Sequence, residues 1–273
     1  MTEPVRKHDD NPLAGLSVDE RKSLAYDLDT PTKLLFLLSK DSDMEVRWDV
    51  AENLNAPAEA LSALSEDENS GVRGGVAKNS NAPQQVLAHL SKDENSGVKR
   101  SVAENPETPP QVLALLSEDK NWWVRRAVAF NWKTPAKILT RLSGDEESEV
   151  QLCVCGNPNT PAEVLTGLSK NQAWWVRHGV ASNPNTATEV LTELSKDQNL
   201  EVQRELTFNP NVPTETLLAL KNNEDWWVRF GVALNPNTPI EVLTELSEDE
   251  KVEVQHVAEA QLKDRNPEQV AVR

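Results

Sequence analysis

A unit of 26 residues repeats along this chain from Asp27 onward without insertion or deletion. The run Asn-Pro-Asn-Thr begins at Asn157, Asn183 and Asn235, and these starts are separated by multiples of the same length. A unit this short cannot bury its own apolar face, so neighbouring units must stack on one another. The register therefore predicts a solenoid of nine repeats over residues 27–260. It favours a function spread over a surface and disfavours an enzyme cleft.

The first half of each repeat has the pattern of a helix start followed by a core helix. In the repeat 157–182, Thr160 is expected to be the N-cap, Pro161 to take the first helical position and Glu163 to complete a capping box. Leu165 and Leu168 follow at helical spacing, and leucine recurs at both places in all nine repeats. These leucines are predicted to be core residues.

The second half of each repeat predicts a shorter second helix. A polar loop such as Asp-Glu-Asn supplies Asx side chains that can cap it, and Val-Arg-x-x-Val-Ala follows, as at Val124–Ala129. The Asn at the repeat boundary is expected to take a left-handed C-terminal conformation and to form a buried hydrogen-bonded ladder between layers. The period-two alternation of strands is absent, so the sequence predicts an all-α fold of two-helix repeats.

The repeated run Asn-Pro-Asn-Thr-Pro-x-Glu-Val-Leu-x-x-Leu-Ser-x-Asp, followed by Glu/Trp-Val-Arg-x-x-Val-Ala, resembles the leucine-rich repeat variant family of bacteria. The resemblance extends from Asp27 to Ala260. It implies a right-handed, HEAT-like α-solenoid or superhelix in which α-helices alternate with shorter, 3₁₀-like helices, and it implies no general enzymatic activity. Some members carry a cysteine-rich iron–sulfur module at the N-terminus, but Met1–Tyr26 contains no Cys.

The two ends of the chain depart from the repeat. Residues 1–26 are expected to form a degenerate N-terminal cap, in which Asp19–Tyr26 corresponds to a second helix. Residues 261–273 are expected to form a charged C-terminal tail. Atypical terminal units are usual in solenoids, because they must close the stack with a polar face.

The composition limits the partners that this chain can bind. A net charge of −16 disfavours nucleic acid and anionic membranes. No apolar run approaches the roughly 20 residues that a membrane-spanning helix needs, and the first ten residues do not resemble a signal peptide. Cys153 and Cys155 are two residues apart on an expected helix and can neither form a disulfide nor share a metal ion. We therefore expect a cytoplasmic protein without a disulfide framework.

The outward face of the second helices varies from repeat to repeat and is the candidate binding surface. Helical geometry places Trp123, Arg126 and Phe130 on one outward face. The corresponding candidates in later repeats are Trp175, His178, Arg204, Trp227 and Phe230. Exposed aromatic residues beside arginine are typical interface anchors. A packing role remains the alternative, in which the first Trp of each pair fills the core and the second is covered by a neighbour.

A basic row is the second candidate. It consists of Arg47, Arg73, Lys99, Arg125, Arg177 and Arg229. A phosphate-binding groove is conceivable, but every repeat also supplies acidic residues in its loop. Ion pairing between repeats is therefore the favoured interpretation.

These observations predict a non-catalytic scaffold, monomeric and without cofactor or metal, that binds a protein or peptide partner. We expect the second helices to line its concave side. Three alternatives remain open. They are an accessory scaffold with a small molecule or cofactor in an aromatic-lined groove, a nucleic-acid binder similar to HEAT-like DNA glycosylases, and an acidic DNA mimic.

Overall fold

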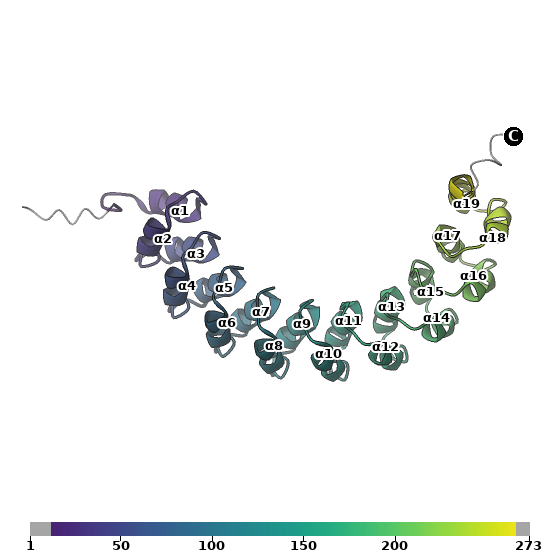
Figure 1. Cartoon of the computed structure of the whole chain (residues 1–273), viewed down its shortest axis with the longest axis horizontal. Coiled ribbons are helices and arrows are strands. Elements are labelled where there is room, and N and C mark those ends of the chain that lie inside the picture. The colour runs from purple at the N-terminus through teal and green to yellow at the C-terminus, as the bar shows by residue number, and fades with distance from the viewer. Residues whose placement is uncertain (1–11, 266–273) are drawn as a thin grey trace, which may run out of the picture. The chain divides into compact units, whose positions relative to one another are not determined.

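In the computed structural model, residues 12–265 can be described, and within that range the chain forms 19 α-helices and no strand (Figure 1). The predicted all-α repeat fold is confirmed. The chain divides into two compact units, Met1–Lys133 and Thr134–Arg273, which are described separately below.

The helices form two rows that follow the 26-residue register. The first helices of the repeats are α2 (Thr32–Leu38), α4 (Ala58–Leu64), α6 (Gln84–Leu90), α8 (Pro110–Leu116), α10 (Ala136–Leu142), α12 (Ala162–Leu168), α14 (Thr188–Leu194), α16 (Thr214–Leu220) and α18 (Ile240–Leu246). The second helices are α3 (Met44–Glu52), α5 (Ser70–Lys78), α7 (Ser96–Glu104), α9 (Trp122–Phe130), α11 (Ser148–Gly156), α13 (Trp174–Ser182), α15 (Leu200–Thr207), α17 (Trp226–Leu234) and α19 (Val252–Arg265). Helix α1 (Val18–Tyr26) precedes them.

The first helix is the shorter of the two, contrary to expectation, and both rows are α-helical throughout residues 12–265. The first helix α12 begins after Pro161 and ends at Ser169, whose hydroxyl donates to the carbonyl of Thr166 at 2.9 Å. A serine hydroxyl that bonds back to the helix in this way competes with further helical hydrogen bonding. This serine recurs at the ends of most first helices, although α16 has the same length of seven residues with Lys221 in its place.

The predicted capping box is wrong. Pro161 is the N-cap of α12, and no side chain caps that end. The hydroxyl of Thr160 instead donates to the carbonyl of Val154 at 2.5 Å, in the preceding second helix. That carbonyl lies in the last turn of α11, where carbonyl groups lack helical partners. Thr160 therefore ties one helix to the next.

The Asx caps are confirmed for α3, α5, α7, α9, α15 and α17, whereas α11 and α13 follow Glu147 and Ala173 and have no side-chain cap. Asn121, for example, accepts a hydrogen bond from the backbone N–H of Trp123 at 3.0 Å. The prediction that the boundary Asn is left-handed is wrong. Asn79 has φ −64° and ψ 121°, and no non-glycine residue among 12–265 has a positive φ. The chain leaves each second helix in an extended conformation and turns immediately into the next repeat.

The core runs between the two rows. The repeated leucines of the first helices and the valines of the second helices are buried, as predicted, including Leu165 and Leu191 at 0% exposure. Within each unit, successive second helices pack directly against one another, whereas successive first helices make far fewer contacts. The second helices accordingly line the inner side of the bend in each unit (Figure 1).

A ladder of buried asparagine side chains joins the layers within each unit, as predicted. The amide nitrogen of Asn105 donates to the carbonyls of Ala77 at 2.7 Å and Asn79 at 2.9 Å, both at the C-terminal end of the preceding second helix, α5. Its side-chain oxygen accepts from the backbone N–H of Glu107 at 2.8 Å. A buried amide with both ends satisfied stabilises the stack without leaving a polar group unpaired.

The basic row forms ion pairs between repeats, which confirms the favoured interpretation. We call each pair of a second-helix cation with the Asp of the next loop a charged rung. The charged rungs seen within the units are Arg21–Asp41, Arg47–Asp67, Arg73–Asp93, Lys99–Asp119, Arg177–Asp197 and Arg229–Asp249.

The geometry of a charged rung is bidentate and largely desolvated. Arg177 Nε lies 2.6 Å from Asp197 Oδ2, Nη2 lies 2.8 Å from Oδ1, and the Asp197 side chain is 7% exposed. Arg177 Nη1 also donates to the carbonyls of Asn171 and Gln172 in its own loop. Burial raises the pKa of Asp197, but hydrogen bonds from Arg177 and the N–H of Asn199 outweigh it and hold that pKa below its usual value.

Two rungs in Thr134–Arg273 are neutral. Where glutamine replaces the arginine, asparagine replaces the aspartate, and Asn171 Nδ2 donates to Gln151 Oε1 at 2.6 Å. Asn223 and Gln203 repeat the arrangement at 2.9 Å. The exchange of both partners together preserves the hydrogen bond and leaves no charge without a counter-ion.

Two close approaches between second helices depend on glycine. A Cβ on Gly231 of α17 would lie 1.8 Å from the hydroxyl oxygen of Thr207 on α15. A Cβ on Gly179 of α13 would lie 2.9 Å from the Cβ of Cys155 on α11. Thr207 and Cys155 take the place that alanine holds in most repeats. A larger residue in one layer is thus matched by a glycine in the next.

The first and last described helices close the stack. Helix α1 packs on α3, as expected of a cap, and residues 1–11 of the predicted cap lie outside the described residues. Helix α19 continues past residue 260 to Arg265, whose guanidinium donates to the carbonyls of Thr238 at 2.7 Å and Asn235 at 3.2 Å. One layer earlier, the carbonyls corresponding to Asn235 and Thr238 accept from ladder Asn235 and from Asn237, respectively. Residues 266–273 of the predicted tail lie outside the described residues.

Candidate partner-binding surface

The second tryptophan of each pair projects into solvent. Trp123 is 45% exposed, Trp175 40% and Trp227 38%, whereas the neighbouring valines Val124 and Val176 are fully buried. The pattern follows from the helix period, because residues just before a buried valine lie near the edge of the buried face. These tryptophans are not covered by adjacent repeats in the described part of the chain.

In Thr134–Arg273, aromatic rings lie along α13, α15 and α17. Trp227 stacks on Phe230 with ring centroids 5.0 Å apart and an interplanar angle of 17°. Trp174 lies edge-on to Trp175 at 6.0 Å and to His178 at 6.2 Å. Trp174 itself is 38% exposed, so the first Trp of this pair is not only core packing. Contacts of this kind hold the rings in fixed orientations, which lowers the entropic cost of binding a partner.

Phe208 extends the same surface between α15 and α17. Its ring atom Cζ would lie 3.5 Å from a Cβ placed on Gly231, so the ring reaches over α17 in the next repeat. Phe208 is nevertheless 41% exposed. Phe208 holds the register position of Phe130 three repeats later, but it was not among the predicted binding residues.

In Met1–Lys133, the corresponding surface combines tryptophan with arginine. Trp122 and Trp123 stack at 4.3 Å, and the guanidinium groups of Arg100 and Arg126 lie 5.6 Å and 5.7 Å from the centre of the Trp123 ring. Phe130 at the end of α9 is 70% exposed. Arg100 was missed by sequence reasoning. The signal that could have found it is its register, because it holds the position of Arg126 one repeat earlier.

The predicted cationic residues of Thr134–Arg273 already have acidic partners. Arg204 binds Asp225 through Nε at 3.0 Å and Nη2 at 2.6 Å, and it binds Glu201 through Nη1 at 2.7 Å. The hydrogen bond from Arg204 is the largest cause that lowers the pKa of Asp225. His178 Nε2 lies 3.4 Å from Glu205.

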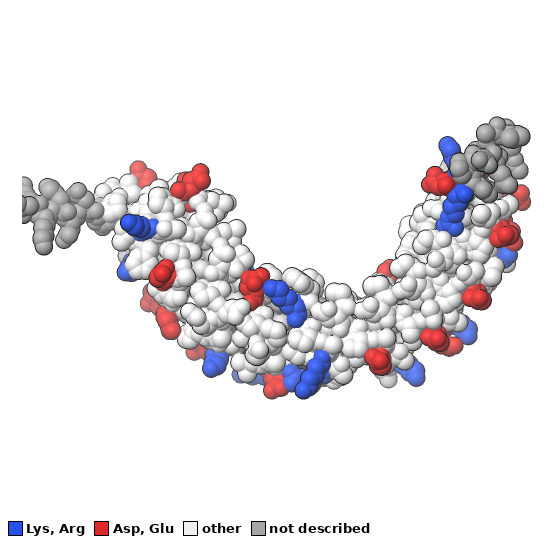
Figure 2. Space-filling view, viewed as in Figure 1, with Lys and Arg blue, Asp and Glu red and all other residues white. Residues whose placement is uncertain are grey.

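Charge is distributed unevenly over the residues of the second unit. On the drawn face, charged side chains gather over the first helices and the loops, and the second-helix row is mostly uncharged (Figure 2). The exposed carboxylates that do lie on the second helices include Glu149, Glu201 and Glu253. The outward face of the second helices in this unit therefore combines apolar side chains with a few carboxylates.

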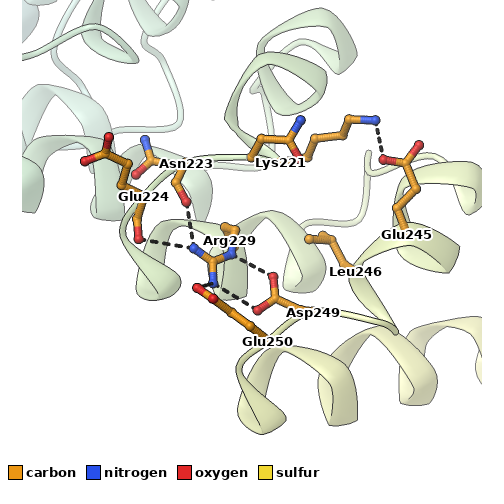
Figure 3. A pocket seen from close by; sticks show the side chains of 9 residues that line it. Lys221, Asn223, Glu224, Arg229, Glu245, Leu246, Asp249 and Glu250 are labelled. Carbon is orange, nitrogen blue, oxygen red and sulfur yellow. Dashed lines mark hydrogen bonds and ion pairs between the residues drawn. The ribbon is translucent and has the colours of Figure 1, made fainter.

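A polar hollow lies between the loops of the last two repeats, away from the tryptophans (Figure 3). Arg229 is at its centre and donates to Asp249, Glu250 and the carbonyls of Asn223 and Glu224. Lys221 on its rim pairs with Glu245. The cations of this hollow are already neutralised by the protein, so it does not resemble a phosphate site, and its lining is not aromatic.

Two further searches covered residues 12–265. In that range no group of three or more His, Cys, Asp or Glu side chains is arranged to hold a metal ion. No helix in the same range is both long enough and apolar enough to cross a bilayer.

Comparison with known proteins agrees with the repeat geometry. The family model described as leucine rich repeat variant matches residues 226–251, which run from the start of α17 to the loop before α19. The resemblance to the leucine-rich repeat variant family is confirmed. No curated protein sequence matches the chain.

One solved structure shows the same fold, and two others are less similar. A leucine-rich repeat variant protein, described as having a novel repetitive structural motif, is 24% identical, with a TM-score of 0.53; the match covers 89% of this chain and 86% of that one. An engineered protein is 19% identical over 90% of this chain and 94% of its own, with a TM-score of 0.42. YibA of Escherichia coli is 18% identical over 89% of this chain and 95% of its own, with a TM-score of 0.45. The leucine-rich repeat variant structure supports the fold of this chain, and the other two carry no further argument.

Proposed function

We propose that this leucine-rich repeat variant chain is a non-catalytic scaffold that binds a protein or peptide partner through the outward residues of its second helices. The supporting observation is the exposure of Trp123, Trp175 and Trp227 in rigid aromatic clusters. Large exposed aromatic side chains on a fixed framework are the residues that most often carry binding energy at protein interfaces.

The proposed contacts divide into anchors and selectivity residues. Trp123, Phe130, Trp175, Trp227 and Phe230 supply apolar area. The selectivity residues are Arg126, His178 and Arg204, of which Arg204 acts chiefly by fixing Glu201 and Asp225.

The compartment is proposed to be a reducing one, such as the bacterial cytoplasm. Cys153 and Cys155 are not joined in a disulfide. Burial, with Cys153 nearby, raises the pKa of Cys155 to about 12, which keeps this thiol protonated and unreactive.

Affinity capture from a native lysate tests the proposal. The bait is the full chain, compared with a variant carrying Trp123→Ala, Trp175→Ala and Trp227→Ala. The expected result is loss of the captured proteins with little change in the melting temperature. Trp132→Ala is the matched control, because Trp132 is 60% exposed and lies in a turn outside the second helices. Capture of the same proteins by the triple variant would contradict the proposal.

A further inference from the structure

Glutamate and tryptophan alternate at one position of five successive second helices in the second unit. Glu149, Trp175, Glu201, Trp227 and Glu253 lie on α11, α13, α15, α17 and α19, each 26 residues after the last. All five side chains are exposed. We call this set the Glu–Trp row. Each of its two tryptophans has a carboxylate in the layer before it and another in the layer after it.

The chain itself shows how these tryptophans can be used. In Met1–Lys133, Arg100 and Arg126 lie over Trp123, and in the second unit Lys251 lies 5.1 Å from the centre of Trp226. The negative face of an indole ring attracts cations in this geometry. Trp123 therefore already holds cations from its own chain.

Trp175 and Trp227 have no such cation among residues 134–265. The place that Arg126 holds beside Trp123 is taken by His178 beside Trp175 and by Phe230 beside Trp227. Arg204 holds the place of Arg100 relative to Trp227, but Asp225 and Glu201 bind its guanidinium. Because Phe230 stacks on one face of Trp227, the opposite face of that ring and the exposed Trp175 ring are the surfaces available to a cation from another molecule.

We propose that the Glu–Trp row binds a basic, extended segment of the partner protein, in which arginine side chains stack on Trp175 and Trp227 between the flanking carboxylates. The inference rests on the proposed scaffold function and specifies the chemistry of its partner. Charge complementarity supports it, since the whole chain carries −16 and Glu149 makes no ion pair among residues 12–265. Glu201 and Glu253 already pair with Arg204 and Lys251. Arginine fits better than lysine because its planar guanidinium stacks on aromatic rings and binds carboxylates through two nitrogens.

The repeat spacing sets the spacing of the arginines. Packed helices lie about 8–10 Å apart, so two layers separate the tryptophans by roughly 20 Å. An extended chain advances about 3.3 Å per residue, which corresponds to about six residues between the two arginines.

Fluorescence anisotropy with a defined probe tests the inference. The probe is a labelled 12-residue Gly/Ser peptide that carries two arginines six residues apart, titrated with the full chain. We expect Trp175→Phe to weaken binding about 2–5-fold, as loss of part of one cation–π contact implies, and Trp175→Ala with Trp227→Ala to weaken it at least about 10-fold. Trp132→Ala should leave binding unchanged. Trp175→Phe preserves most of the packing, so its effect separates recognition from folding.

Charge is tested separately with Glu149→Gln. Glu201 is unsuitable because its removal would free Arg204. Glu149→Gln should weaken binding of the arginine peptide about 2-fold or more at low salt and should reduce the salt dependence.

Two outcomes would overturn the inference. One is equal or tighter binding of the same peptide with leucine or glutamate in place of arginine, and the other is unchanged binding by the double tryptophan variant. If the arginine peptide does not bind but captured partners are still lost from the triple tryptophan variant, the scaffold function stands and the basic partner is wrong.

Discussion

The asparagine ladder predicts that Asn105→Asp lowers the free energy of unfolding far more than the reverse substitution, Asp27→Asn, at the same repeat position. In Asn105→Asp, the side-chain oxygen can still accept the N–H of Glu107, but the two donors to Ala77 and Asn79 are lost. Both carbonyls lose the side-chain donor and face a carboxylate. The Ala77 carbonyl is left without a donor, whereas the Asn79 carbonyl still accepts from the N–H of Ala82. The second oxygen of the new carboxylate also lacks a donor. An unsatisfied buried polar group costs about 1–3 kcal/mol, so these two groups give a loss of about 3 kcal/mol or more.

The first repeat supplies the control. Asp27 holds the ladder position there, and its side-chain oxygen accepts the N–H of Asp29 at 2.9 Å, as the ladder asparagines accept theirs. Within residues 12–265 the layer of α1 is the first, so the described part of the chain holds no preceding layer whose carbonyls an amide at residue 27 could reach. Asp27→Asn should therefore change stability by less than about 0.5 kcal/mol, as surface substitutions usually do.

Thermal unfolding followed by circular dichroism measures both variants. A loss of about 3 kcal/mol corresponds to a fall of roughly 6–12 °C in melting temperature for units of this size. The deficit of Asn105→Asp relative to wild type should shrink at acidic pH, because a protonated carboxyl can again donate one hydrogen bond. A melting temperature within about 2 °C of wild type at pH 7 would refute this account of the ladder.

The remaining predictions concern packing and charge. Gly231→Ala should lower the free energy of unfolding by about 1–3 kcal/mol through overpacking against Thr207. Adding Thr207→Ala should recover most of that loss in the same thermal melt. A double variant as unstable as Gly231→Ala alone would contradict the contact. The double variant Arg177→Gln/Asp197→Asn should have a free energy of unfolding within about 1 kcal/mol of wild type, because the neutral pair occurs naturally. Asp197→Asn alone should be less stable than the double variant. Additive effects in a double-mutant cycle would argue against coupling of the two residues. The folded-state pKa of Asp197 is below its ordinary value of 3.8, so its contribution is present above that pH and is lost as pH falls below it. Urea midpoints should therefore fall less between pH 5 and pH 2.5 in the double variant than in wild type.

The stacking of the layers could be predicted from the sequence because its determinants recur in every repeat. The leucine pairs, the boundary asparagines and the basic row each occupy a constant place, and a constant place in a solenoid implies a role in stacking. The pairing of the basic row with loop aspartates followed from charge alone, since a row of buried cations needs counter-ions. Its neutral counterpart, Gln151 with Asn171, was visible in the sequence only as two separate substitutions.

The local details were less predictable because several partners compete for the same group. Thr160 has a capping-box sequence around it, yet its hydroxyl satisfies the carbonyl of Val154 in the preceding helix. A sequence motif counts only neighbours along the chain and misses a buried acceptor brought close by stacking. The exposure of Trp123 and Trp175 depends in the same way on how far adjacent layers extend.

The ladder also gives the array a direction. Within each unit, every ladder amide reaches toward the N-terminal layer, so each added repeat brings the donors that its predecessor requires. The first repeat needs only an aspartate, whereas the last described layer needs the long side chain of Arg265 to cover its free carbonyls. Such an array can lengthen by internal duplication of whole blocks without redesign of either end. The tryptophan pairs recur every 52 residues, which is the spacing that doubling of a two-repeat block would produce.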